Sequence, residues 1–240
     1  SKLSAPKNSN LKTVMDFSFF DKINIAKTEQ TETWFKGLDR VYNNFVYDFL
    51  YPNPASVLAF IENHDTDRFL GEGDNLPMLK QASTLLLTTR RIPQLYYGTE
   101  IMMNGVKSKS DGYVRKDFPG GWTGDTETAL TAAGRSKIQN ECYNFYKTLL
   151  NWRKGNDVIA KGNMVQFMVQ NGVYAYARQH EGKTVFVMLN GTDAKTTVPL
   201  KFYKEVLKDS KQGKDILSGK TVTFGESLTM GPRESLVIEL

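Results

Sequence analysis

The sequence has 240 residues, of which 40% are hydrophobic and 24% charged, with a formal net charge of +5. This length suits one large or two ordinary globular domains. No run approaches the ~18 consecutive apolar residues that a membrane-spanning helix needs, so we expect no membrane partner. The surplus lysines are scattered with few aromatic residues between them, which is typical of a solvated face and not of a nucleic-acid-binding surface.

The first part of the chain predicts one short strand and one helix. Residues 1–10 are polar, lack an initiator Met and have no apolar core of a signal peptide, so we expect a loop at an internal start, as in a fragment or processed chain. Residues 14–17 indicate a short strand, and residues 23–33 indicate a loop. Apolar residues from Leu38 to Phe49 then recur at helical spacing until the Pro-rich segment that follows.

Two further strands surround a second helix. The apolar run at 57–61 predicts a buried strand, and residues 78–89 predict an amphipathic helix that Asn75 or Asp74 caps. Residues 92–97 predict the next strand. This strand–helix–strand order is typical of a parallel sheet.

A long segment without periodicity separates this region from a third helix. Residues 101–130 are rich in glycine, and a loop of this length is often functional. Apolar residues from Ile138 to Trp152 then form one face of a helix that Gly155 ends, with Thr131 as its expected cap. Cys142 lies on that face; as the single cysteine it cannot form an internal disulfide, and we interpret it as a buried structural thiol. The redox compartment therefore stays open.

From Asn156 onward, the sequence pattern changes to that of short strands. Six strand-like runs are separated by turn signals, of which Asn171-Gly172 is the strongest hairpin signal. Residues 156–240 therefore predict an all-β sandwich.

Three segments carry a resemblance to a known family. Residues 60–65, Phe-Ile-Glu-Asn-His-Asp, resemble the Phe-x-x-Asn-His-Asp motif that closes the seventh barrel strand in the α-amylase family of glycoside hydrolases. Residues 11–17 resemble the sixth strand of that barrel and residues 92–100 the eighth. Within that family, the overall sequence pattern most resembles that of neopullulanases and cyclomaltodextrinases. The resemblance implies an α/β fold class: the C-terminal portion of a (β/α)8 TIM barrel at 1–155, followed by the β-sandwich domain at 156–240.

The resemblance also implies roles for the residues of the motif. Retaining cleavage of a glucosidic bond needs a nucleophile and an acid, and this family adds a third carboxylate that stabilises the transition state. By position in the motif, that catalytic carboxylate is Asp65, and His64 hydrogen-bonds a sugar hydroxyl. Asn63 belongs to the same substrate-binding set, although it orients the strand end more than it touches the bond. The alternatives are a loop-capping Asp65 and a structural His64.

Other candidate residues flank the motif. Asp67 and Arg68 either pair with each other or bind substrate, and both interpretations stay open. By strand alternation, the Glu62 side chain points away from the face that Asp65 serves, so we expect it to form a salt bridge. Arg115, Asp117 and Trp122 of the long loop are placed by the resemblance near the sugar-binding cleft, where Trp122 stacks on a sugar face. The alternative is a loop packed on the barrel rim.

The nucleophile and acid motifs of the family are absent from this sequence, so the resemblance puts them upstream of Ser1. The implied parent reaction is hydrolysis of α-1,4 links in pullulan, cyclodextrins or maltooligosaccharides, with this chain alone inactive. A family transglycosylase and a non-catalytic amylase-like interaction module are the alternatives. The expected partners are an α-glucan oligosaccharide and either the upstream part of the same protein or a second copy.

The sequence indicates no cofactor and no metal site. Two distant His and one Cys do not make a zinc site. Calcium in the longer parent protein stays open, because the family binds it through loops that lie upstream. A starch-utilising role favours a periplasmic or extracellular location over a cytoplasmic one.

Overall fold

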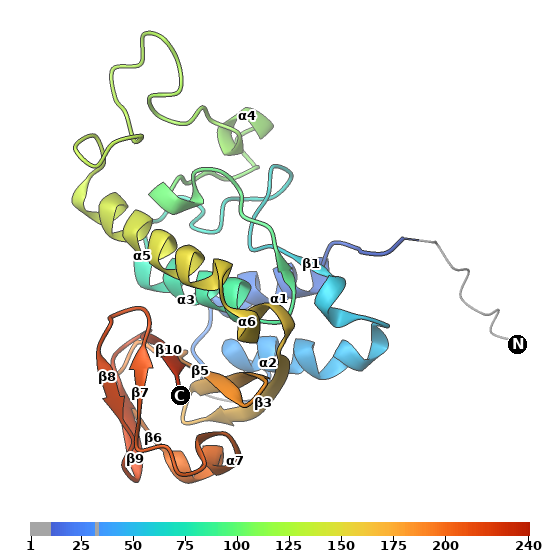
Figure 1. The fold of residues 1–240 in the computed structure, drawn as a ribbon. Helices are drawn as coiled ribbons and strands as arrows, with labels where there is room; N and C mark the ends of the chain where they lie inside the picture. The colour runs from blue at the N-terminus through green and yellow to red at the C-terminus, as the bar shows by residue number, and fades with distance from the viewer. Residues whose placement is uncertain (1–10, 32–33) are drawn as a thin grey trace, which may run out of the picture.

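The computed structural model describes residues 11–31 and 34–240, in which helices lie against one large antiparallel sheet (Figure 1). The loop expected at 1–10 lies outside the described residues. The helices are α1 (Phe17–Ala26), α2 (Leu38–Val46), α3 (Leu76–Thr88), α4 (Asp111–Val114), α5 (Lys137–Lys154), α6 (Asp157–Lys161) and α7 (Lys204–Leu207). Single 3-10 turns lie at Tyr47–Leu50, Pro54–Ser56, Thr99–Ile101 and Leu200–Tyr203.

Short parallel segments lie side by side in the N-terminal part. β1 (Leu58–Ala59) pairs in parallel with β2 (Ile92–Pro93), and Met15 bridges Leu58 on the other side of β1. The backbone N–H of Asp16 donates to the Leu58 carbonyl at 2.7 Å, and the N–H of Ile92 donates to the Val57 carbonyl at 2.9 Å. The three segments are therefore neighbours in the predicted order. The predicted strand at 14–17 is only an isolated bridge at Met15, and the other two strands are shorter than predicted. The described residues do not contain a closed barrel.

The C-terminal part forms two antiparallel sheets, which confirms the mostly β character of the region predicted as an all-β sandwich. The larger sheet has the order β3-β4-β5-β10-β7-β8, and β6 pairs with β9 in the smaller one. The strands are β3 (Asn163–Gln170), β4 (Val173–His180), β5 (Lys183–Asn190), β6 (Thr196–Pro199), β7 (Gln212–Asp215), β8 (Thr221–Thr223), β9 (Ser227–Met230) and β10 (Ser235–Glu239). The predicted hairpin at Asn171-Gly172 joins β3 to β4, and both residues have the positive φ angles, 49° and 77°, that a tight primed turn requires.

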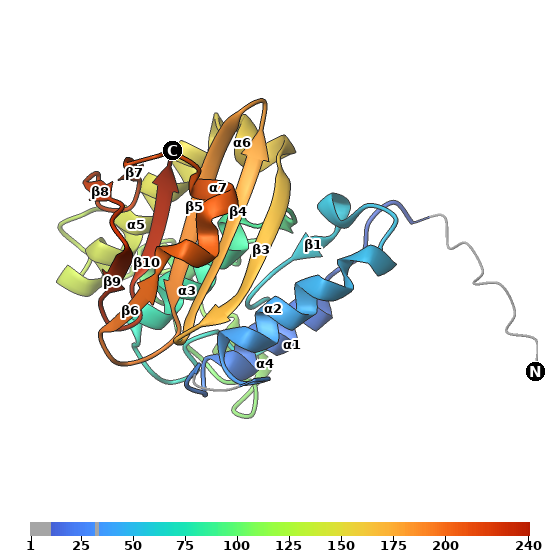
Figure 2. The ribbon, with the colours of Figure 1, turned by 90° about the horizontal axis from the view of Figure 1, so that it is seen from below.

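The central strands of the large sheet, β4, β5 and β10, are buried on both faces. Figure 2 shows α7 lying across one face of this sheet. Alternate residues of β4 point to opposite sides: Val173, Ala175 and Ala177 face the small sheet and α7, whereas Tyr174 and Tyr176 join the core formed with the helices. Both tyrosines are fully buried. Because this core is shared, the helical part and the β part pack as continuous layers, and the division at 155/156 stays a prediction.

Polar links join α3 to the sheet. The Gln81 side-chain amide donates to the Asn190 carbonyl at 2.8 Å, and Arg178 donates to the Thr88 carbonyl at 3.0 Å. The hydroxyls of Thr88 and Tyr176 share a hydrogen bond. These bonds satisfy buried polar groups that would otherwise destabilise the layer.

Several local predictions are corrected by the structure. Phe17, expected to end a strand, and residues 23–26, expected to belong to a loop, are part of α1, whose N-cap Asp16 accepts from the Phe19 N–H at 2.9 Å. The cap of α5 is Ser136 with a capping box to Gln139, not Thr131. The predicted cap of α3 at Asn75 is confirmed, because its side chain accepts from the Met78 N–H at 3.1 Å.

Candidate active site

The turn that follows β1 is shaped by Asn63. Its side-chain oxygen accepts from the Asp65 N–H at 2.8 Å, and its own N–H donates to the Thr66 hydroxyl at 3.0 Å. Asn63 is buried, so its amide is used inside the turn. This arrangement holds the backbone of the next two residues at the tip of the parallel strand.

His64 and Asp65 are exposed at that tip and contact each other. Their side chains are 60% and 59% exposed, and the His64 Nε2 lies 3.2 Å from one Asp65 carboxylate oxygen. The other oxygen lies 3.0 Å from Arg115 Nη2. Arg115 Nε also donates to the His64 carbonyl at 2.8 Å. The Asp65 carboxylate is thus held between an imidazole and a guanidinium while it stays open to solvent.

The loop after β2 supplies the cations around Asp65. α4 ends beside Arg115, whose guanidinium also lies 3.2 Å from Asp111. Lys107 donates through its Nζ to the Asp65 carbonyl at 2.9 Å and through its N–H to Asp67 at 2.5 Å. The sequence identified Arg115 but not Lys107, because only the folding of a distant loop brings Lys107 to the strand tip.

A buried ion pair lies beneath this turn. Glu62 and Arg68 are both inaccessible, and their charged groups are 3.4 Å apart, which confirms the salt bridge predicted for Glu62. Burial raises the pKa of Glu62, while hydrogen bonds from Thr99 and the Phe69 N–H, and the Arg68 charge, lower it. Glu62, at the start of the turn, therefore binds both Arg68 and the backbone N–H of Phe69 at the end of the turn.

Arg68 is placed differently from the predicted substrate contact. Its guanidinium donates to the Tyr97 carbonyl at 2.5 Å and to the Val114 carbonyl at 3.1 Å, and it lies 4.0 Å from the centre of the Tyr96 ring. A side chain with no exposed surface cannot touch a sugar, so Arg68 is a positioning residue here. Nor does it pair with Asp67, which lies exposed and bonded to Lys107.

Trp122 is 67% exposed in the long loop. The Trp122 backbone N–H donates to the Asp125 carboxylate at 3.1 Å, and the Gly120 backbone N–H donates to the same carboxylate at 2.8 Å. Within the described residues, no hydrogen bond or ring contact joins Trp122 to His64, Asp65 or Arg115. The ring is thus available for stacking, but the structure does not bring it into the cluster.

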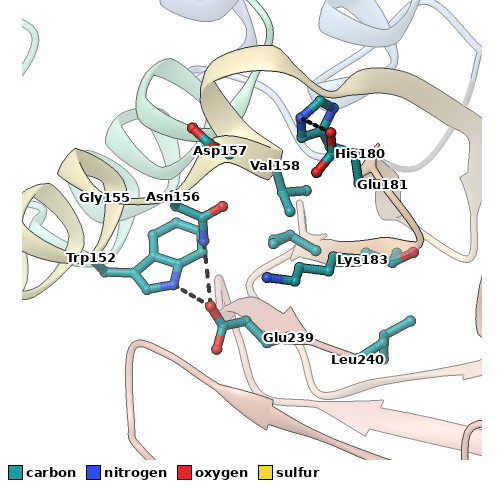
Figure 3. Close-up of a pocket in the computed structure, with 12 residues that line it drawn as sticks. Trp152, Gly155, Asn156, Asp157, Val158, His180, Glu181, Lys183, Glu239 and Leu240 are labelled. Atoms are coloured by element: carbon teal, nitrogen blue, oxygen red, sulfur yellow. Dashed lines mark hydrogen bonds and ion pairs between the residues drawn. The ribbon is translucent and has the colours of Figure 1, made fainter.

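A concave region lies away from Asp65, where the helices meet the large sheet. This groove of about 610 Å³ runs between the α5–α6 turn and the β4–β5 hairpin (Figure 3). Glu239 accepts from the Trp152 indole N–H at 2.7 Å and from the Asn156 amide at 3.4 Å. One carboxylate oxygen therefore ties α5 and α6 to β10, which gives Glu239 a structural role at the junction.

Other site chemistries find no support in the described part of the chain. Across residues 11–31 and 34–240, no group of three or more His, Cys, Asp or Glu is arranged to hold a metal ion. The Cys142 thiol is buried, and burial raises its pKa to about 12, which confirms the interpretation as a structural thiol. Over the same described ranges, none of the helices is both long and apolar enough to span a bilayer.

Comparisons with known proteins indicate the family. Residues 164–239 match the family model of the Cyclo-malto-dextrinase C-terminal domain. The chain is 30% identical over 228 residues to an alpha-amylase of Niallia circulans, covering 92% of this chain and 38% of that protein. It is 31% identical over 217 residues to a cyclomaltodextrin glucanotransferase of Thermoanaerobacterium thermosulfurigenes, covering 87% of this chain and 28% of that protein.

Solved structures share the fold of the chain. An Anoxybacillus alpha-amylase superposes with a TM-score of 0.76 at 19% identity, over 95% of this chain and 47% of that one. CldA, a cyclomaltodextrin glucanotransferase with a three-domain ABC distribution, gives 0.72 at 24% identity, over 94% and 44%. By these matches the chain is similar to the C-terminal region of α-amylase-family proteins, which confirms the resemblance. It spans less than half the length of these relatives.

Proposed function

We propose that this chain is the C-terminal part of an α-glucan-active enzyme whose catalytic barrel it completes. In this proposal, the three parallel segments are the last three strands of a (β/α)8 barrel. Their parallel order, Met15–β1–β2, supports it. The longer protein would hydrolyse α-1,4-glucosidic bonds in maltooligosaccharides, cyclodextrins or pullulan.

The single observation that carries the function is the position of the Asp65 carboxylate. It is exposed at the carboxyl end of a parallel strand, where barrel enzymes keep their catalytic groups, and it contacts His64 and Arg115. A carboxylate that is fixed and charged stabilises the positive charge that develops on the sugar during bond cleavage. His64, 60% exposed, supplies a hydrogen-bonding group beside it.

The same geometry assigns supporting roles to neighbouring residues. Asn63 shapes the turn, and the buried Glu62–Arg68 pair holds both ends of it. In this proposal, Asp67 and Trp122 contact the sugar farther from the reacting bond. In the same proposal, the nucleophile, the acid and any calcium site of the longer protein lie upstream of this chain.

The partner in this proposal is the upstream part of the same protein. Exposed apolar side chains gather on and beside the parallel segments: Val14, Met15, Phe17, Ile92, Leu95 and Tyr97. A cluster of exposed apolar side chains usually packs against another segment or another protein. The related proteins continue well beyond the length of this chain, which favours an upstream segment over a second copy. A self-associated chain is the alternative outcome.

A second candidate function is transglycosylation. Several relatives carry the name cyclomaltodextrin glucanotransferase, and the proposed role of Asp65 is the same whether water or a sugar accepts the glycosyl group. The match of residues 164–239 to the Cyclo-malto-dextrinase C-terminal domain favours hydrolysis. Product analysis with maltoheptaose separates the two, because transfer yields longer or cyclic products. A non-catalytic interaction module of the same fold would give neither.

We expect the chain alone to be inactive on maltooligosaccharides. It lacks the two carboxyl groups that carry out covalent catalysis in a retaining glycosidase. The measurement is the release of reducing ends from maltoheptaose by the purified 240-residue chain. Turnover that persists through further purification would contradict the proposal, because a different carboxylate pair would then have to exist within the chain.

A further inference from the structure

A groove of about 300 Å³ lies between the start of α2 and the β3–β4 hairpin, two segments that lie side by side in Figure 1. Its walls carry aromatic and amide side chains, among them Trp34, Phe35 and Tyr42 on one side and Gln170 and Asn171 on the other. Trp34 is 74% exposed and Phe35 is 61% exposed. Two adjacent large rings exposed in this way contribute little to the core, so their position needs another explanation.

Thr31 and Gly37, which lie on either side of the two rings in the sequence, are held by hydrogen bonds. The Thr31 N–H donates to the Gly191 carbonyl at 3.0 Å, and the Thr31 hydroxyl accepts from the Leu38 N–H at 2.9 Å. The Gly37 N–H donates to Glu29 at 2.8 Å. Hydrogen bonds from Arg40 lower the pKa of Glu29 to about 2, so this anchor stays charged.

The backbone at Phe35 is held in an uncommon conformation. Its φ of 64° lies in the left-handed region, where a bulky residue is rare and strained. The Phe35 N–H donates to the Asp39 carboxylate at 2.6 Å, which stabilises this conformation. The exposed rings therefore sit on an anchored segment.

Hydrogen-bonding groups border the rings. The Asn43 Nδ2 donates to the Asp39 carbonyl at 2.7 Å, which leaves its amide oxygen for another donor. The Asn171 Nδ2 donates to the Thr197 carbonyl at 3.1 Å, with the same consequence for its oxygen. Over the ranges that the structure describes, the side-chain amide of Gln170 makes no hydrogen bond. The groove thus offers both donors and acceptors next to two flat apolar surfaces.

This combination fits a neutral sugar chain. A pyranose ring presents a flat face of C–H groups and a rim of hydroxyls, so it needs an aromatic platform bordered by donors and acceptors. An anionic ligand would need cations, whereas the residues that line the groove include the acid Asp39 and no Lys or Arg. Amides, which both donate and accept, match hydroxyls better than they match an apolar peptide.

We propose that this groove is a second α-glucan-binding site, distinct from the site at Asp65. The choice of α-glucan rests on the proposed function, but the groove shares no residue with the Asp65 cluster. Binding at two places on one polymer raises the effective concentration of the chain segment at the catalytic site. The groove would therefore tether polymeric substrate and add little for short oligosaccharides.

The test measures binding by the 240-residue chain in native gels that contain amylopectin, with maltoheptaose titration calorimetry for affinity. Trp34→Ala should weaken binding about tenfold, as truncation of an aromatic anchor does. Trp34→Tyr should retain most of the affinity, and Gln170→Ala should cause a smaller loss. Phe49→Ala is the matched control, because Phe49 is an equally exposed ring outside the groove.

The readouts separate this site from the catalytic proposal, because binding is measured on the 240-residue chain, whereas Asp65 is tested through kcat in the longer protein. Asp74→Asn, an exposed position outside both the groove and the Asp65 cluster, should leave amylopectin binding unchanged. Equal retardation of Trp34→Ala and the parent chain would overturn the proposal. Absence of retardation by amylopectin, or equal retardation by a β-1,3-glucan, would overturn it as well.

Discussion

Replacing Asp65 with asparagine in the longer protein is expected to lower kcat by about two to three orders of magnitude, with a smaller change in KM. Loss of one charge-stabilising group typically costs roughly 3–4 kcal/mol in the transition state. The asparagine keeps the shape of the side chain but removes the negative charge 3.0 Å from Arg115, which then pairs with Asp111 alone. The measurement is steady-state hydrolysis of maltoheptaose.

The matched control for this experiment is Asp74→Asn. Asp74 is exposed in the same stretch of chain but lies outside the Asp65 cluster. It should retain parental kcat and KM. A near-parental kcat for Asp65→Asn would show that the motif had been assigned the wrong role, and a loss shared by both variants would point to misfolding.

Replacing Arg91 with methionine is expected to destabilise the fold by about 3–5 kcal/mol, the cost of leaving a buried charge without its partner. The Arg91 guanidinium lies 2.8 Å from Asp16 and 2.6 Å from Asp48, and all three side chains are inaccessible. Its loss leaves the buried Asp16 carboxylate without a cation, whereas Asp48 keeps its ion pair with Arg90. Urea unfolding, followed by circular dichroism, measures the change.

Arg40→Met is the control for Arg91→Met. Arg40 pairs with Glu29 at 2.6 Å, but both side chains are partly exposed, so water replaces the lost partner. We expect a change below about 1 kcal/mol. Similar unfolding midpoints for the two variants would contradict the claim that the Asp16–Arg91–Asp48 cluster holds α1 and the 3-10 turn at Tyr47–Leu50 against the parallel strands.

Local signals in the sequence were sufficient for some elements. The Asn171-Gly172 hairpin was predicted because only a tight primed turn places such a pair between two apolar strands, and its φ angles confirm it. α5 was predicted from its apolar face, and its centre agrees with the structure. Its start was not, because Thr131 and Ser136 are both good caps and only Ser136 has a glutamine three residues later.

Elements defined by tertiary contacts were missed. β7 reads Gln-Gly-Lys-Asp, with no apolar alternation, and becomes a strand because β10 and β8 pair with it. α1 was hidden because its aromatic residues also suit a strand. At the candidate site, the motif located Asp65 and His64, but the burial of Arg68 and the approach of Lys107 depend on the loop after β2.

The most direct test of the role of Asp65 is a crystal structure of the longer protein with a bound maltooligosaccharide. We expect an Asp65 carboxylate oxygen to lie within about 3 Å of a hydroxyl of the sugar at the reacting bond, with His64 hydrogen-bonded to the same sugar. We also expect the parallel segments at Met15, β1 and β2 to form consecutive strands of the barrel wall. A sugar seated elsewhere, with Asp65 facing only solvent and Arg115, would contradict the central claim.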